Sequence, residues 1–314
     1  MQPIVAVWLG DALAAYGFGG GHPFGSDRLG AFWSGMVELG IDRRVEVRPP
    51  VSATRVDLEL FHTPEHLDRV QHLSESGRGL LDGGDTPAFE GMYEAAATVA
   101  GTVLDAVAWM LAAPKRRAFV PVAGLHHGHR ESASGFCVVN DCGIAIEALR
   151  RRHGIARIAY VDIDAHHGDG VYDGFADDPE VFIADIHEDG RYLFPGTGGA
   201  HQVGVGAGLG TKLNLPLPPG AGDDEFLAAW VEAEAHVEDA RPEVILLQCG
   251  ADGLGGDPLT HLRYSQRVYR HAARRLCALT DRFCEGRLLV LGGGGYSRAN
   301  LTAAWGAVVA ELLE

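Results

Sequence analysis

The sequence predicts a single α/β domain built on a central, mostly parallel β-sheet with helices on both faces. Short runs rich in β-branched residues alternate along the chain with longer segments of helical apolar spacing. These runs lack the polar alternation of a half-exposed strand, so they suit a sheet that is buried on both faces. The 314 residues contain no long linker, repeat or low-complexity block, which fits one domain over 1–314.

The elements follow in order from these patterns. The expected strands are IVAVW (4–8), AFVPV (118–122), RIAYVDID (157–164), EVFIAD (180–185), EVILLQCG (243–250) and RLLVLGG (287–293). The expected helices cover about 90–112, 140–153, 223–239, 261–284 and 297–313. The Gly- and Pro-rich stretch 195–222 is expected to form ordered loops near a site, with TKLNLPL as a further candidate strand.

Composition excludes some partners. A net charge of −16 argues against nonspecific binding to nucleic acid or anionic membranes, because both would repel the chain. The first residues lack the basic region of a signal peptide, and Asp11 comes too early for a membrane span. Five cysteines (137, 142, 249, 277 and 284) include no CxxC pair, so we expect free thiols and a cytoplasmic protein.

Ionisable side chains follow five of the expected strands at their carboxyl ends. In open α/β sheets this edge is where ligands bind. The residues are His126 and His127, then Asp162, Asp164, His166, His167 and Asp169, then Asp185 and His187, then Asp252, and finally Tyr296. Each alone is more simply a capping aspartate or a packed histidine, but five strand ends of this kind indicate one shared site.

Part of this set has the pattern of a metal site. Alternate residues of an extended chain point the same way, so Asp162, Asp164 and His166 share one side, and two neighbours there can hold one metal. Asp252 is a candidate third ligand. Three mixed oxygen and nitrogen ligands with an open position are typical of catalytic zinc. The remaining acids and the two histidines, His126 and His127, permit two His–Asp pairs, although spacing does not assign them.

Seven segments, in order, resemble the zinc-dependent histone deacetylase family of the arginase/deacetylase superfamily, in its bacterial, acetoin-utilisation-type branch. The segments are HPFGSDR (22–28), GDTPAFEGMYEAA (84–96), GLHHGHRESASGFCVVND (124–141), YVDIDAHHGDGV (160–171), RYLFPGTGG (191–199), GADGLGGDPLTHL (250–262) and LGGGGYS (291–297). An ordered set over nearly the whole chain is far more specific than one short motif. The resemblance implies the arginase/deacetylase fold and hydrolysis of acetyl, or another short acyl group, from the ε-amine of lysine in proteins or peptides.

The resemblance also implies roles for the catalytic residues. One zinc ion per chain would be held by Asp164, His166 and Asp252. His126 is implied as the general base that removes a proton from the attacking water, with Asp162 as its partner. His127 is implied to pair with Asp169, and the Tyr296 hydroxyl is implied to stabilise the oxyanion. His167 receives no role beyond packing or hydrogen bonding.

Substrate-binding residues follow from the same resemblance. Phe136 and Phe194 are implied as the walls of a narrow acyl-lysine tunnel, with Gly135 and Leu259 also among the residues around the substrate. Asp85 matches a rim aspartate that holds the substrate backbone. A last match is Arg28, which corresponds to an arginine near an inner channel for acetate release.

Two sites for a monovalent cation, K⁺ or Na⁺, are implied as well. The first would use Asp162 and the main-chain oxygens of Asp164, His166 and Ile186, with Asp185 at a position that is commonly serine. The second would use main-chain oxygens around Phe175, Asp178, Val181 and Thr211.

Three alternatives stay open at this point. An acetylpolyamine amidohydrolase needs an acid at the tunnel mouth, where Leu259 is apolar, but Glu188 and Asp189 keep this reading open. A ureohydrolase with two manganese ions needs a paired DxD, whereas QCGAD contains only Asp252. An inactive acyl-lysine-binding module would lack Tyr296 or a histidine of the pair, and both are present. The oligomeric state and the physiological substrate leave no mark on the sequence.

Overall fold

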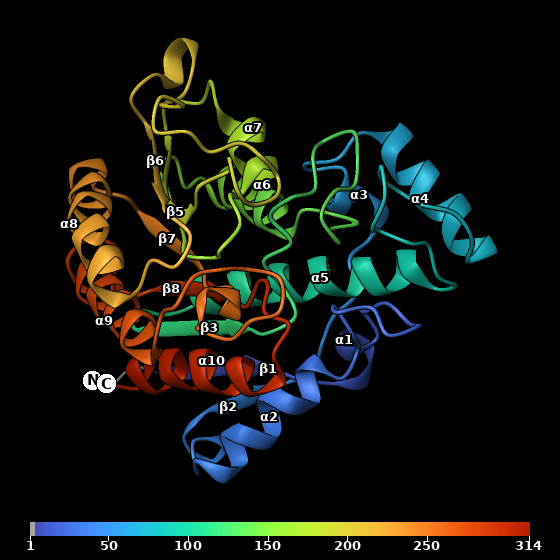
Figure 1. The fold of residues 1–314 in the computed structure, drawn as a ribbon, viewed down its shortest axis with the longest axis horizontal. Coiled ribbons are helices and arrows are strands. Elements are labelled where there is room, and N and C mark those ends of the chain that lie inside the picture. The colour runs from blue at the N-terminus through green and yellow to red at the C-terminus, as the bar shows by residue number, and fades with distance from the viewer. Residues whose placement is uncertain (1–3) are drawn as a thin grey trace.

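Short apolar strands assemble into one parallel sheet in the computed structural model, which describes residues 4–314 (Figure 1). The strands are β1 (Ile4–Trp8), β2 (Glu46–Arg48), β3 (Arg116–Val120), β4 (Ile158–Asp162), β5 (Val181–Glu188), β6 (Lys212–Leu217), β7 (Val244–Gln248) and β8 (Leu288–Leu291). Their order is β2-β1-β3-β8-β7-β4-β5-β6, and neighbouring strands run parallel throughout. Every residue of β4, β7 and β8 is buried, which explains their unbroken apolar sequences.

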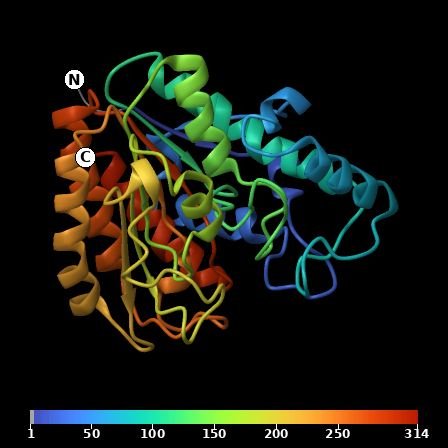
Figure 2. The ribbon, with the colours of Figure 1, turned by 90° about the horizontal axis from the view of Figure 1, so that it is seen from above.

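Helices cover both faces of the sheet, as Figure 2 shows. They are α1 (Asp11–Ala14), α2 (Arg28–Glu38), α3 (Arg55–Leu58), α4 (Pro64–Ser76), α5 (Met92–Leu111), α6 (Asp141–His153), α7 (Asp169–Phe175), α8 (Asp223–Ala240), α9 (Gln266–Phe283) and α10 (Arg298–Leu312). Helices α8, α9 and α10 lie on one face, and α5 and α6 lie on the other. The predicted α/β architecture is confirmed.

Most expected elements form close to their predicted bounds, and TKLNLPL supplies β6. The helix expected from 261 begins instead at Gln266, because Ser265 caps it by accepting a hydrogen bond from the Arg267 N–H. Strand β4 ends at Asp162, whose carboxylate accepts the N–H of Asp164 and turns the chain. Strand β5 continues beyond the expected end at Asp185 to Glu188, so His187 lies within it rather than after it.

Helix α5 is the one described helix that is long and apolar enough to cross a membrane. It packs against β3 and α6, and 72% of its apolar window is buried inside the fold. Its apolar sequence is therefore accounted for by its place in the core.

The strand order brings the predicted site together. Strands β3 and β4 are consecutive in the chain, yet β8 and β7 lie between them in the sheet. Such a change of direction opens a crevice at the carboxyl ends of the strands. The residues that follow β3, β8, β7 and β4 therefore meet at one edge.

Candidate active site

The turn with His126 and His127 follows β3 and is held by the start of α6. The Asp141 carboxylate accepts the N–H groups of Gly124 and Leu125, each at 2.8 Å. Asn140 caps α6, and its side-chain amide donates to the carbonyl of His126 at 3.3 Å. The side chains of Asn140 and Asp141 are fully buried, so water does not compete for the hydrogen bonds that fix this turn.

Both expected His–Asp pairs form. His126 Nδ1 lies 2.8 Å from Asp162 Oδ2, and His127 Nδ1 lies 2.6 Å from Asp169 Oδ1. The two Nε2 atoms are 3.0 Å apart, so one of them carries a proton that the other accepts.

The charges around the two histidines differ. Burial opposes a charge on His126, but the nearby carboxylates of Asp162 and Asp164 outweigh it and raise the pKa of His126 to about 10. Burial and the neighbouring His126 lower the pKa of His127 to about 4. The carboxylates beside His126 therefore make it the more basic imidazole of the pair.

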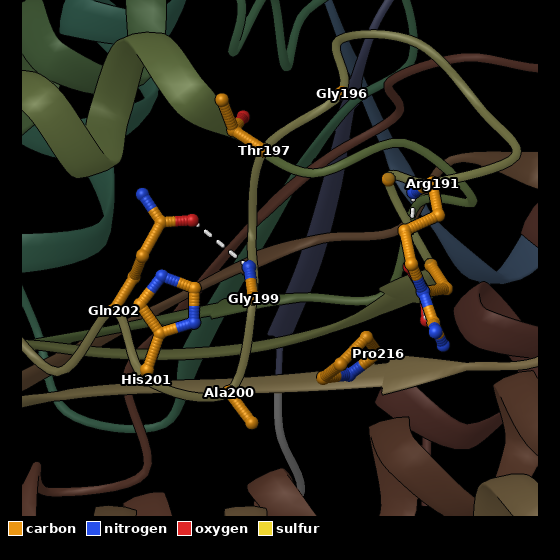
Figure 3. A pocket seen from close by; sticks show the side chains of 10 residues that line it. Arg191, Gly196, Thr197, Gly199, Ala200, His201, Gln202 and Pro216 are labelled. Carbon is orange, nitrogen blue, oxygen red and sulfur yellow. Dashed lines mark hydrogen bonds and ion pairs between the residues drawn. The ribbon is translucent and has the colours of Figure 1, made fainter.

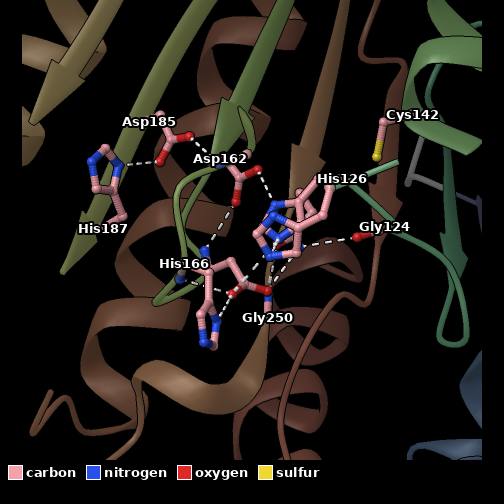
Figure 4. A network of polar contacts seen from close by, with 12 residues as sticks. Gly124, His126, Cys142, Asp162, His166, Asp185, His187 and Gly250 are labelled. Carbon is pink, nitrogen blue, oxygen red and sulfur yellow. Dashed lines mark hydrogen bonds and ion pairs between the residues drawn. The ribbon is translucent and has the colours of Figure 1, made fainter. Parts of the chain in front are cut away.

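The predicted metal ligands also meet. One potential ligand atom from each of Asp164, His166 and Asp252 lies within 4.8 Å of the other two, and all three residues are buried. His166 Nδ1 is 3.1 Å from both Asp164 Oδ1 and Asp252 Oδ2. Burial and the charge of Asp164 raise the pKa of Asp252 to about 7, so these carboxylates repel each other. Figure 4 shows His166 beside the His126–Asp162 pair.

Glycines make room for this cluster. A Cβ atom on Gly250 would lie 1.9 Å from Asp164 Oδ2, and one on Gly294 would lie 2.1 Å from Asp252 Oδ2. Two carboxylates and one imidazole, with glycine rather than a side chain at positions 250 and 294, fit a zinc ion with an open coordination position.

Two supporting residues were not predicted. Gln248 ends β7, donates to Asp164 Oδ2 at 2.8 Å and accepts the Gly250 N–H at 2.8 Å. A polar residue at the end of the apolar run VILLQ was the available signal. Asp257 accepts the N–H of Tyr296 at 2.8 Å and so fixes the backbone of that residue.

A cavity of about 360 Å³ leads from the surface to this chemistry. Its lining includes all the implied tunnel residues, namely Asp85, Gly135, Phe136, Phe194 and Leu259, together with His127, His166 and Tyr296. His22, which sequence reasoning missed, also lies at this mouth, with its ring 4.5 Å from that of Phe136 and its Nε2 3.1 Å from the Asp85 carbonyl oxygen.

The backbone of Phe136 is clamped from two sides. Its φ of 68° lies in the left-handed region, which residues other than glycine rarely adopt. Thr86 Oγ1 accepts the Phe136 N–H at 3.0 Å, and the Tyr16 hydroxyl donates to the Phe136 carbonyl at 2.7 Å. The same hydroxyl accepts the Val138 N–H at 2.9 Å. The tunnel wall is therefore held in an unusual conformation by residues far away in the sequence.

A second cavity of only about 10 Å³ lies at the inner end, lined by His126, His127, Asp164, His166 and Tyr296 among others. Arg28 is buried behind its wall, where Nε donates to the Gly295 carbonyl at 3.0 Å and Nη2 to that of Gly293 at 2.6 Å. Its guanidinium also stacks 3.9 Å from the Phe24 ring centre. Arg28 thus supports the glycine run that precedes Tyr296.

The acids of the first expected cation site lie side by side. Asp162 and Asp185 are register partners on β4 and β5. Asp185 accepts hydrogen bonds from His187 Nδ1 at 2.6 Å and from the Gly168 N–H at 2.9 Å. Burial, opposed by His126 but reinforced by Asp185, raises the pKa of Asp162 to about 6. Two adjacent buried carboxylates are a donor set that suits a hard cation.

Two oxygens of the second expected cation site, by contrast, accept hydrogen bonds from a lysine. The Lys212 ammonium group donates to the Asp178 carbonyl at 2.9 Å and to the Val181 carbonyl at 2.7 Å. Two of the four expected ligands are therefore already bonded to a positive charge of the chain itself. This contact was not anticipated from the sequence, because main-chain ligands leave no sequence pattern that shows which side chain lies opposite them.

His167 and the cysteines behave as expected. His167 Nδ1 lies 2.8 Å from Thr197 Oγ1, and its ring packs 4.9 Å from that of His187. All five cysteines are buried and free.

A parallel α/β sheet whose carboxyl edge unites an Asp–His–Asp cluster, two His–Asp pairs and a tyrosine defines a candidate metal-dependent hydrolase. Residues 22–312 match the family described as Histone deacetylase domain. The chain therefore belongs to the histone deacetylase family.

Individual relatives agree with this assignment. The chain is 38% identical over 284 residues to the acetoin utilization protein AcuC of Bacillus subtilis, which covers 88% of this chain and 73% of that protein. It is 31% identical over 310 residues to histone deacetylase clr6 of Schizosaccharomyces pombe, which covers 96% of this chain and 75% of that protein. The crystal structure of the HDA15 HD domain matches with a TM-score of 0.90 at 26% identity, covering 100% of this chain and 89% of that one.

Proposed function

We propose that this protein is a zinc-dependent deacetylase that removes acetyl groups from the ε-amine of lysine in proteins or peptides. The observation that carries the proposal is the Asp164–His166–Asp252 cluster beside the two His–Asp pairs, at the inner end of a tunnel walled by Phe136 and Phe194. Asp164, His166 and Asp252 would hold the zinc ion. When bound, such an ion polarises a carbonyl and makes water a nucleophile at neutral pH.

The histidine pair moves the protons. Asp162 orients His126, whose Nε2 faces the cluster and takes up the proton released as water attacks. The 3.0 Å contact between the Nε2 atoms lets that proton pass to His127, where the Asp169 carboxylate stabilises the imidazolium. His127 lines the tunnel and delivers the proton to the departing lysine amine. Acid–base catalysis of this kind contributes about 10²–10⁴-fold in rate.

Tyr296 stabilises the oxyanion. Burial and the negative charges of Asp252 and Asp164 raise the pKa of Tyr296 well above its usual value, so the hydroxyl keeps its proton. It is therefore a hydrogen-bond donor at neutral pH. A donor placed at a developing oxyanion contributes about 10²–10³-fold in rate.

The tunnel mouth supports acyl-lysine over an acetylpolyamine. The Glu188 carboxylate is buried and accepts the N–H of His261 at 2.9 Å. Asp189 is bonded to Arg191 and lines a separate cavity of about 510 Å³, shown in Figure 3. Neither acid lines the tunnel, whereas Leu259 does. Asp85 is the one acid in this lining and is proposed to bind the substrate backbone, so a distal ammonium group of a polyamine meets an apolar side chain at the position of Leu259.

The proposal also includes the remaining predictions made from the sequence. Asp85 at the rim would hold the substrate backbone. A K⁺ or Na⁺ ion would be held by Asp162, Asp185 and the main-chain oxygens of Asp164, His166 and Ile186. The single cluster of three potential ligands found among residues 4–314 supports one catalytic metal rather than the two of a ureohydrolase. The five free thiols support a reducing compartment such as the cytoplasm.

The test is hydrolysis of an acetyl-lysine peptide by the zinc-loaded protein. We expect turnover that is lost on chelation and restored by zinc. Tyr296→Phe should lower kcat by about 10²–10³-fold without changing the bound zinc. Tyr192→Phe is the matched control, because Tyr192 is 59% exposed on a loop outside the tunnel, and it should be unaffected. Full activity of Tyr296→Phe would show that the Tyr296 hydroxyl is not the oxyanion donor.

A further inference from the structure

Lys212 is an unusual residue in this chain. Of 26 basic residues, only Lys115 and Lys212 are lysines, and the rest are arginines. Lys212 begins β6 and is 1% exposed, so its charge lies in the interior of the protein. A buried charge is costly unless hydrogen bonds satisfy it.

The Lys212 ammonium group has an acceptor for each of its three N–H bonds. These are the Asp178 carbonyl at 2.9 Å, the Val181 carbonyl at 2.7 Å and Thr211 Oγ1 at 2.6 Å. Burial lowers the pKa of Lys212 to about 8, which leaves it mostly charged at neutral pH. A compact ammonium fits a ring of converging oxygens, whereas the planar fork of arginine does not.

The other two oxygens of this ring have partners as well. The Phe175 carbonyl accepts the Asp178 N–H at 3.0 Å. The Thr211 carbonyl accepts the Ile183 N–H at 3.0 Å and lies 3.2 Å from His236 Nε2. At the distances Lys212 keeps from its acceptors, no ion fits between the nitrogen and the oxygens.

We propose that the Lys212 ammonium group replaces the second monovalent cation of the family with a charge that is part of the chain. The group joins the turn after α7 and the start of β5 to the start of β6 (Figure 1). This part of the fold therefore needs neither K⁺ nor Na⁺. The inference is independent of the proposed enzymatic activity.

Thallium(I), an anomalously scattering substitute for K⁺, tests the proposal in crystals. We expect no thallium peak among the Asp178 and Val181 carbonyls of the wild-type protein, and a peak at that position in Lys212→Ala. A thallium peak at this position in the wild type would overturn the proposal. So would a vacant ring in Lys212→Ala, because the oxygens would then not be an ion site at all.

Thermal unfolding in KCl and in choline chloride of equal ionic strength gives a second readout. Lys212→Ala should gain a K⁺-dependent rise in Tm, whereas Lys212→Met fills the space without a charge and should not. Lys212→Met should lower Tm by roughly 5–10 °C, because two buried carbonyls lose their donor. Lys115→Ala is the matched control and should follow the wild type, including any response of the first cation site. An equal K⁺ response in Lys212→Ala and Lys115→Ala overturns the proposal, and if neither Lys212 variant folds, the wild-type crystal decides.

Discussion

Removing the hydroxyl group of Tyr16, which lies 120 positions before Phe136, should destabilise the tunnel wall that Phe136 forms. The Tyr16 hydroxyl is the only group that bonds both the Phe136 carbonyl and the Val138 N–H among the described residues. Tyr16→Phe leaves this donor and this acceptor without a partner inside the protein. Each such group costs about 1–3 kcal/mol, so the variant should lose about 2–6 kcal/mol of unfolding free energy.

The same change should reach the active site. Phe136 keeps a φ of 68°, and a residue in this region holds about 1–3 kcal/mol of strain that its surroundings must restrain. Once the Tyr16 bond is lost, the backbone can relax and move a ring that packs 5.9 Å from that of Tyr296. We expect kcat/KM for an acetyl-lysine peptide to fall about 10–100-fold, with unchanged zinc content.

Denaturant unfolding and steady-state kinetics on the same samples measure both effects. Tyr264→Phe is the control, because Tyr264 is 3% exposed and its hydroxyl lacks a partner within residues 4–314. That variant should be at least as stable as the wild type. If Tyr16→Phe matches Tyr264→Phe in stability and kcat/KM, the hydrogen bonds of the Tyr16 hydroxyl do not stabilise the conformation of Phe136.

Three further predictions concern the acyl group, the metal and pH. The inner cavity of about 10 Å³ leaves little room beyond an acetyl group. We therefore expect kcat/KM to fall about 10–200-fold for each methylene added to the acyl chain. Equal rates on acetyl-lysine and butyryl-lysine peptides would contradict this. Gly294→Ala would place a Cβ 2.1 Å from Asp252 Oδ2 and should weaken zinc binding at least tenfold in a competition titration, whereas Gly30→Ala, with open space around it, should not. Burial lowers the pKa of His62 to about 3, below its unfolded value of about 6.5. Between these two pH values the unfolded state binds a proton on His62 that the folded state does not. The free energy of unfolding therefore decreases as pH falls below about 6.5. The expected loss of unfolding free energy is about 2 kcal/mol by pH 5. The variant His62→Gln keeps an acceptor for the Asn140 N–H, and its unfolding free energy should depend correspondingly less on pH.

The chemistry at the sheet edge was predictable because parallel strands end together. Apolar runs predicted β3, β4, β7 and β8, and the polar residues after them had to meet. Asp252 could join Asp164 and His166 for this reason, although 86 positions separate it from His166.

Other parts of the fold and site had weaker signals. Helix α4 carries Thr63 as its cap, Pro64 in its first turn and Gly77 at its end, but its mostly polar sequence hides the apolar spacing we relied on. Strand β2 has three residues at the sheet edge and no buried face. Contacts to main-chain groups, such as those of Tyr16 and Lys212, depend on packing between distant segments and leave no local pattern.

The most direct test of the account is a side-by-side measurement of kcat/KM for an acetyl-lysine peptide and for N-acetylputrescine, with metal content determined on the same sample. We predict one zinc ion per chain and efficient turnover of the peptide, with the polyamine at least tenfold poorer, roughly the loss of one favourable polar contact. Turnover of acetylputrescine alone would contradict the substrate assignment, and two manganese ions with neither activity would contradict the deacetylase mechanism itself.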